Sequence, residues 1–124
     1  MSALDRISVA AIGTSVAELE AEALRAEAAG VECVWAPELF RSAVTQATYL
    51  AAKTERIGVA TGIVWAFTRS PFILAVSALD VDEMSGGRFR LGLGRGSNGS
   101  TRPGTTPSTD GRHRTCTRRS RRRA

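Results

Sequence analysis

The chain has 124 residues, a formal net charge of +5 at neutral pH and 43% hydrophobic residues, a size that suits one small domain. Its two cysteines lie far apart and its one histidine stands near the C-terminus, which argues against a disulfide framework and against a zinc site. Because no run approaches the roughly 18 apolar residues of a membrane span, and no export signal opens the chain, we expect a cytoplasmic protein.

The positive charge is confined to the C-terminal segment. Residues 1–97 contain nine Lys or Arg and eleven Asp or Glu, whereas residues 98–124 contain eight Arg and one Asp. The latter segment also lacks Val, Ile, Leu, Met, Phe, Trp and Tyr, so it has no apolar surface to offset the roughly 1–2 kcal/mol per residue that ordering a backbone costs. We expect one domain over residues 1–97 and a disordered basic tail over residues 98–124.

The first half of the domain alternates between strand and helix patterns. The apolar run at 7–12 indicates a strand buried on both faces. Ser15 and Glu18 then form a capping box that opens an amphipathic helix, and Gly30 is placed to end it. A second strand is predicted at 31–36, stopped by a proline, and a second helix at 42–54.

The second half continues the alternation. A third strand is predicted at 56–64, and Ser70 followed by proline is a favourable start for a helix that runs to two glycines at 86–87. A fourth strand is predicted at 88–94. Strands joined through helices run parallel, and parallel sheets need helical cover. The pattern therefore predicts an α/β fold, either a doubly wound sheet or part of a (β/α)8 barrel.

Glycines at 94, 96 and 99 have the spacing of a dinucleotide-binding loop. That loop requires a helix to begin within it, because the helix N-terminus binds the pyrophosphate. The residues that follow contain two prolines and no helical periodicity, and Asp110 comes too early to bind a ribose. We interpret the glycines as a strand end at which neighbouring backbone or a ligand comes close.

Several segments together resemble the luciferase-like monooxygenase superfamily, and within it the branch that uses the deazaflavin coenzyme F420. They are GVECVWAPELF (30–40), KTERIGVATGIV (53–64), TRSP (68–71) and SGGRFRLGLGRG (85–96). The resemblance implies the N-terminal half of a (β/α)8 TIM barrel, with four parallel strands alternating with three helices. It also implies a flavin- or F420-dependent oxidoreductase of the monooxygenase type, which transfers a hydride to or from a small organic substrate with F420 or, alternatively, FMN.

The resemblance further implies that the cofactor ring lies at the C-terminal ends of the strands. The matching cofactor-binding positions are Thr61, Gly62, Ile63 and Gly94, and the bond Gly62–Ile63 matches a non-prolyl cis peptide of many relatives. Glu38 matches a position that often carries an acid or an imidazole, which implies a catalytic residue that positions the ring or relays a proton. The alternative for Glu38 is a carboxylate that favours the dipole of the following helix.

Three further side chains allow more than one interpretation. Arg69 is expected to be solvated or paired with Glu38 or Asp80, rather than bound to an anionic cofactor tail. Trp35 is expected in the core, and Trp65 in a pocket wall or as a plug in a loop. No metal site is expected.

The sequence also departs from this family. A complete barrel needs roughly 250 residues, so we expect a truncated or frameshifted product that is inactive alone and that could form a homodimer through its exposed half-barrel edges. A non-catalytic half-barrel module is one alternative. A nucleic-acid binder acting through RHRTCTRRSRRRA is another, disfavoured because no aromatic residues interleave with the arginines.

Overall fold

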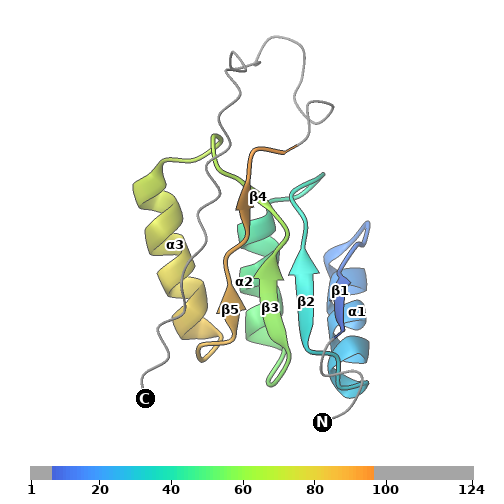
Figure 1. Ribbon diagram of the computed structural model, residues 1–124. Coiled ribbons are helices and arrows are strands. Elements are labelled where there is room, and N and C mark those ends of the chain that lie inside the picture. Colours follow the sequence, from blue (N-terminus) through green and yellow to red (C-terminus); the bar gives the residue numbers. More distant parts are fainter. Residues whose placement is uncertain (1–6, 97–124) are drawn as a thin grey trace.

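The computed structural model describes residues 7–96, which form a parallel sheet with helices packed against it (Figure 1). In chain order the elements are β1 (Ser8–Ala10), α1 (Val16–Ala28), β2 (Cys33–Ala36), α2 (Ala43–Lys53), β3 (Gly58–Thr61), β4 (Val64–Trp65), α3 (Pro71–Met84), β5 (Phe89–Arg90) and β6 (Leu93–Gly94). The expectations for residues 98–124, the basic tail and its nucleic-acid interpretation, lie outside this range.

All strand pairs are parallel, as the alternation predicts. Four strands form one sheet in the order β1-β2-β3-β5, and β4 pairs with β6 in a second, shorter one. In the register, Val34 pairs with Val9 on one side and with Val59 on the other. The strand order follows the chain order, so each new strand adds to the same edge of the sheet.

The predicted third and fourth strands are each divided in two. The hydroxyl of Thr61 accepts a hydrogen bond from the Gly92 N–H (2.9 Å) and donates one to the Gly92 carbonyl (3.0 Å), so a side chain replaces the backbone ladder at this point. Pairing resumes where the N–H of Val64 donates to the same carbonyl (2.8 Å). The Gly62–Ile63 peptide bond between β3 and β4 is cis, which confirms the expectation drawn from the family resemblance.

The helices begin where the capping signals predict. Ser15 caps α1 by accepting from the N–H of Glu18 (3.2 Å), and the Glu18 carboxylate in turn accepts from the N–H and hydroxyl of Thr14 (2.7 and 2.9 Å). Ser70 caps α3, with Pro71 as its first residue. The N-terminal signals are therefore local and strong enough to be read from sequence.

All three helices share one core with one face of the sheet. Because side chains alternate along a strand, Val34 and Val59 point toward the helices, while Cys33, Trp35 and Ala60 point to the opposite face. Helix side chains pack onto the first of these faces, namely Leu19, Ala23, Ala26, Ala47, Leu50, Ala51 and Val81. None of the helices within residues 7–96 is both long and apolar enough to cross a bilayer.

Glu27, near the end of α1, holds the turn that leads into β3. One of its carboxylate oxygens accepts hydrogen bonds from the N–H groups of Glu55, Arg56 and Ile57 at 2.9, 2.6 and 3.0 Å. Burial acts to raise the pKa of Glu27, but these three bonds and the charge of Arg56 outweigh it and lower the pKa. The carboxylate therefore stays ionised and supplies the acceptor that this turn needs.

Arg88 joins the C-terminal ends of α2 and α3 to the start of β3. Its Nε donates to the carbonyl of Ser85 (2.6 Å), and its Nη1 to the Thr54 hydroxyl (3.1 Å) and the Ile57 carbonyl (2.6 Å). Its Nη2 donates to the carbonyls of Ala51 (3.0 Å) and Thr54 (2.9 Å). All five guanidinium N–H donors are thus used, and two of the acceptors are carbonyls that the end of α2 leaves without a helical partner.

We predict that Arg88→Met lowers the free energy of unfolding by about 2–4 kcal/mol, because it leaves several half-buried carbonyls without donors. Urea denaturation followed by circular dichroism measures the change. Arg90→Met is the control, since Arg90 pairs with Glu32 at an exposed site and its loss is expected to cost under about 1 kcal/mol. Equal losses for the two variants would contradict the role given to Arg88.

Candidate functional site

The C-terminal ends of the parallel strands meet at one edge of the sheet, which we call the C-terminal edge. In barrels of this type, active sites are built at that edge from the loops that follow the strands. A cavity of about 390 Å3 lies there, lined by residues 38–42 after β2, by Trp65 at the end of β4, and by Thr68 and Arg69 after it. This cavity and the strand ends beside it form the candidate site.

Glu38 and Arg69 form a two-pronged ion pair in the wall of this cavity. Nη1 of Arg69 donates to Oε2 of Glu38 at 2.8 Å, and Nη2 donates to Oε1. The N–H of Trp65 also donates to Oε2 (2.7 Å), while Arg69 reaches the hydroxyls of Ser42 and Thr68, both at 3.1 Å. The sequence left Arg69 either solvated or paired with Glu38 or Asp80, and the structure shows the pair with Glu38.

The surroundings of Glu38 favour its ionised form. The side chain is only 9% exposed, and this burial acts to raise its pKa. The hydrogen bonds from Arg69 and from the Trp65 N–H, together with the charge of Arg69, outweigh burial and lower the pKa. A carboxylate with a lowered pKa is a weak base and carries no proton at neutral pH. The group is therefore suited to holding its neighbours in place.

Three of the four predicted cofactor-binding residues lie together on the face of the sheet opposite the helices. A Cβ added at Gly62 would stand 2.9 Å from the Trp35 ring, and one added at Gly94 would stand 2.3 Å from Cδ1 of Ile63. Gly62 is exposed, while Trp35, Ile63 and Gly94 are half-buried. Trp35, Gly62, Ile63 and Gly94 form one surface, which we call the glycine surface. Its side chains are the aromatic ring of Trp35 and the aliphatic side chain of Ile63.

Thr61, the fourth predicted residue, lies elsewhere. It is fully buried, and its hydroxyl is occupied by both backbone groups of Gly92. Val64, on the other side of the cis bond, packs with Ala43 and Leu74 of the helices. The side chains of Thr61 and Val64 therefore belong to the interior, and only Gly62 and Ile63 of this segment reach the open face.

The glycines of the fourth strand allow close approach between neighbouring elements. A Cβ at Gly92 would lie 2.1 Å from the Thr61 carbonyl oxygen, which is backbone and has no room to move aside. Gly96 has a φ of +74°, and a Cβ added there would lie 3.0 Å from Nε1 of the Trp65 ring. Neighbouring backbone therefore comes close at Gly92, whereas side chains occupy the space beside Gly94 and Gly96. Gly99 lies outside the described residues.

Some residues of the site carry no clear signal in the sequence. Ser42 is predicted only as a position near a helix start, yet its hydroxyl also accepts from Arg69. Phe40 stands at the mouth of the cavity with its side chain completely exposed, and the Phe67 ring stacks on Trp65 with centroids 6.1 Å apart. Cys33 is fully buried, and this burial raises the pKa of its thiol. Within residues 7–96 no cluster of three or more His, Cys, Asp or Glu could hold a metal ion.

Residues 1–115 match the family model described as luciferase-like monooxygenase. The chain is 38% identical over 69 residues to 4-hydroxyprotoasukamycin monooxygenase of Streptomyces nodosus subsp. asukaensis, which covers 56% of this chain and 17% of that protein. It is 38% identical over 70 residues to a putative coenzyme F420-dependent oxidoreductase of Mycobacterium tuberculosis, which covers 56% and 20% respectively. The chain thus spans about a fifth of the length of these curated relatives.

Solved structures share the fold. Coenzyme F420-dependent tetrahydromethanopterin reductase from Methanopyrus kandleri superposes with a TM-score of 0.64 at 28% identity, over 76% of this chain and 27% of that one. Monooxygenase RslO1 from Streptomyces bottropensis gives 0.59 at 25% identity, over 73% and 34%. The oxygenating constituent of 3,6-diketocamphane monooxygenase from Pseudomonas putida, in complex with FMN, gives 0.57 at 20% identity, over 63% and 23%, a likeness of fold alone. The described residues thus have the architecture of the N-terminal half of a (β/α)8 barrel, as predicted.

We predict that Glu38 and Arg69 stabilise the fold as a pair. In a double-mutant cycle of Glu38→Gln and Arg69→Met, the coupling is expected to be about 1–3 kcal/mol, because each single variant leaves a half-buried partner unpaired. The exposed pair Arg25 and Glu22 is the control, with an expected coupling below about 0.5 kcal/mol. Urea denaturation at pH 7 measures both cycles.

The same pair predicts a dependence on pH. Since the folded-state pKa of Glu38 lies below its ordinary value of 4.5, the stabilisation is fully present above that value and is lost as the pH falls through the lower folded value. The difference in stability between the native chain and Glu38→Gln should therefore shrink in this acidic range. A constant difference from pH 7 down to pH 3 would contradict the lowered pKa.

Proposed function

The chain belongs to the luciferase-like monooxygenase family, and on that premise we propose that it supplies the first half of the cofactor-binding edge of an oxidoreductase. The cofactor is F420 or FMN, since similar proteins are named for their dependence on F420 and a protein of the same fold holds FMN. In the whole enzyme this ring accepts or donates a hydride in the reaction with a small organic substrate.

The observation that carries this proposal is the glycine surface at the C-terminal edge. A flat tricyclic ring needs a flat, largely apolar surface, and binding sites for such ligands are mostly apolar with a few polar groups. Because Gly62 and Gly94 have no side chains, the Trp35 ring and the Ile63 side chain lie directly against the backbone there, and these two side chains provide the aromatic and aliphatic contact. Since Gly62 is exposed and Ile63 and Gly94 are half-buried, this surface is accessible to a ring.

Within this proposal Glu38 is a positioning residue. Its ionised carboxylate holds the Trp65 N–H and the Arg69 guanidinium, so it sets the segment that follows β4 beside the cavity. The lowered pKa favours this role over the relay of a proton, which was the other role considered for Glu38. Thr61 contributes indirectly, because its bonds to Gly92 align the two strands that carry the glycine surface.

The described residues offer few cationic groups that could bind an anionic cofactor tail. Arg69 is neutralised by Glu38, and Arg41 is the other cation that lines the cavity. The chain also spans only 17% to 34% of the similar proteins quoted above. We therefore propose that the 124-residue chain binds the ring weakly and is inactive by itself.

Titration of the full chain with FMN and, separately, with F420 tests the proposal. We expect saturable changes in the absorbance of the cofactor and quenching of tryptophan fluorescence. Ile63→Lys places a charge on the glycine surface and is expected to weaken binding at least tenfold, about 1.4 kcal/mol. Ile73→Lys, at a 53% exposed position on α3, is the control and should bind as the native chain does. Absence of binding to both cofactors would remove the proposal.

A second candidate function is a non-catalytic half-barrel module that pairs with another copy or another chain. The strands β1 and β5 form the two ends of the sheet, and exposed edge strands with apolar neighbours favour association. Ile12, two residues after β1, is 68% exposed; Leu91, directly after β5, is 37% exposed, and Leu93, in β6, is 49% exposed. Apolar side chains are therefore uncovered at both ends of the sheet.

Sedimentation equilibrium tests this second candidate. If the module pairs through its edges, the native chain sediments as a dimer, and Ile12→Lys or Leu93→Lys shifts it toward the monomer because a buried charge is costly. Leu39→Lys is the control, since Leu39 is 56% exposed but lines the cavity at the C-terminal edge. A native chain that is monomeric at all concentrations rules out pairing with another copy of the chain.

A further inference from the structure

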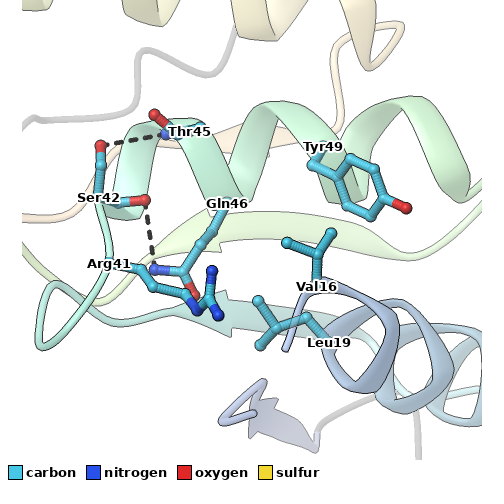
Figure 2. A pocket seen from close by; sticks show the side chains of 7 residues that line it. All are labelled: Val16, Leu19, Arg41, Ser42, Thr45, Gln46 and Tyr49. Carbon is cyan, nitrogen blue, oxygen red and sulfur yellow. Dashed lines mark hydrogen bonds between the residues drawn. The ribbon is translucent and has the colours of Figure 1, made fainter. Parts of the chain in front are cut away.

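A second cavity lies between α1 and α2, away from the glycine surface (Figure 2). Its volume is about 340 Å3, near the lower end of the roughly 300–1,000 Å3 of ligand pockets, so it suits a small molecule. Arg41 and Gln46 lie at one end, and Val16, Leu19 and Tyr49 lie toward the other. The cavity is therefore polar at one end and apolar at the other.

Gln46 is more than nine-tenths buried, with an exposed fraction of 8%. Its amide nitrogen donates to the carbonyls of Pro37 (3.0 Å) and Ser42 (3.2 Å), and Figure 2 shows the second of these bonds. These bonds fix the amide, so its oxygen points away from them. No group within residues 7–96 donates a hydrogen bond to that oxygen. Every fully buried side-chain nitrogen or oxygen of these residues has a hydrogen-bond partner. The Gln46 oxygen is therefore not fully buried and reaches open space. An acceptor is thus held in place at the cavity.

Arg41 supplies donors at the same end. One of its terminal nitrogens donates to the Thr14 carbonyl at 2.5 Å, which holds the side chain across the start of α1. Its other N–H groups bond to no acceptor within the described residues. Glu18 is near enough to interact with the charge of Arg41, but its carboxylate is already bonded to Thr14. The guanidinium is therefore free to bind a carboxylate from a ligand.

The opposite end offers contact only to apolar groups. Val16 is 43% exposed, and Leu19 forms the floor as part of the core. Tyr49 presents its ring, because its hydroxyl donates to Glu20, which does not line the cavity. A branched aliphatic group would cover this wall and remove apolar area from water.

We propose that this cavity binds a small apolar α-amino acid of the size of leucine. The carboxylate pairs with Arg41, the ammonium donates to the Gln46 oxygen, and the side chain packs on Val16, Leu19 and Tyr49. An α-amino acid is the simplest molecule that carries an anion, an adjacent donor and an apolar group. The proposal does not rest on the proposed oxidoreductase function: none of its residues belongs to the glycine surface, although Arg41 also lines the cavity at the C-terminal edge.

Methyl and amide NMR spectra of the full chain, titrated with L-leucine, test the proposal. We expect saturable shifts of the Val16 and Leu19 methyl signals and of the Gln46 side-chain amide. Leucinamide, which lacks the carboxylate, and 4-methylpentanoate, which lacks the ammonium, should each bind about tenfold more weakly. L-Alanine, which lacks most of the aliphatic group, should also bind at least about tenfold more weakly.

Variants add a second measurement. Arg41→Met is expected to weaken leucine binding about tenfold, while Arg25→Met, an exposed α1 arginine paired with Glu22, should leave binding unchanged. Absence of saturable shifts at Val16 and Leu19 overturns the proposal, and so does equal affinity for leucine and leucinamide. The cofactors take no part in this titration, so its outcome is independent of the test of the oxidoreductase function.

Discussion

The guanidinium of Arg88 holds together the N-terminal end of this sheet. Its five hydrogen bonds reach α2, the cap of α3 and the turn before β3, and Arg88 itself immediately precedes β5. These bonds fix the entry to β5, the last strand of the sheet, which pairs with β3. Glu27 acts in the same way on the other side of the turn, where it accepts from three successive N–H groups. The charged side chains of Arg88 and Glu27 therefore hold together the end of the sheet that lies away from the candidate site.

The C-terminal edge is organised by different contacts. Thr61 occupies both backbone groups of Gly92, and the ladder is interrupted where the glycine surface begins. Glu38 and Arg69 then join the segment after β2 to the segment after β4. The end held by Arg88 and Glu27 and the end that carries the candidate site thus correspond to the two ends of the parallel strands, and active sites of (β/α)8 barrels lie at the C-terminal end.

The segment between β2 and α2 connects the two cavities. Arg41 and Ser42 line both the cavity at the C-terminal edge and the one between α1 and α2. Ser42 also caps α2 and accepts from Arg69, while Arg41 reaches back to Thr14 at the start of α1. One short segment therefore places polar groups at two separate surfaces of the half barrel, and each surface has its own set of apolar neighbours.

Much of the architecture could be read from the sequence because it depends on short-range signals. Ser15 and Ser70 start helices through bonds to N–H groups three residues on, and Gly30 ends a helix with a φ of +76°. The alternation of strands and helices predicts parallel pairing, and resemblance to a known family correctly indicated the cis bond at Gly62–Ile63. These features involve neighbours in the chain or a repeated pattern, so no knowledge of distant contacts is needed.

Other features were decided only by tertiary structure. Arg88 forms a hydrogen bond with Ala51, which lies 37 positions away in the sequence. The bonds of Thr61 to Gly92 and of Arg69 to Glu38 each join residues 31 positions apart. Such contacts depend on which strands become neighbours and on how far each side chain reaches, and neither quantity is encoded in local periodicity. For this reason the sequence determined the elements and their direction. The break in two strands, the burial of Thr61 and the cavity beside Gln46 followed from packing.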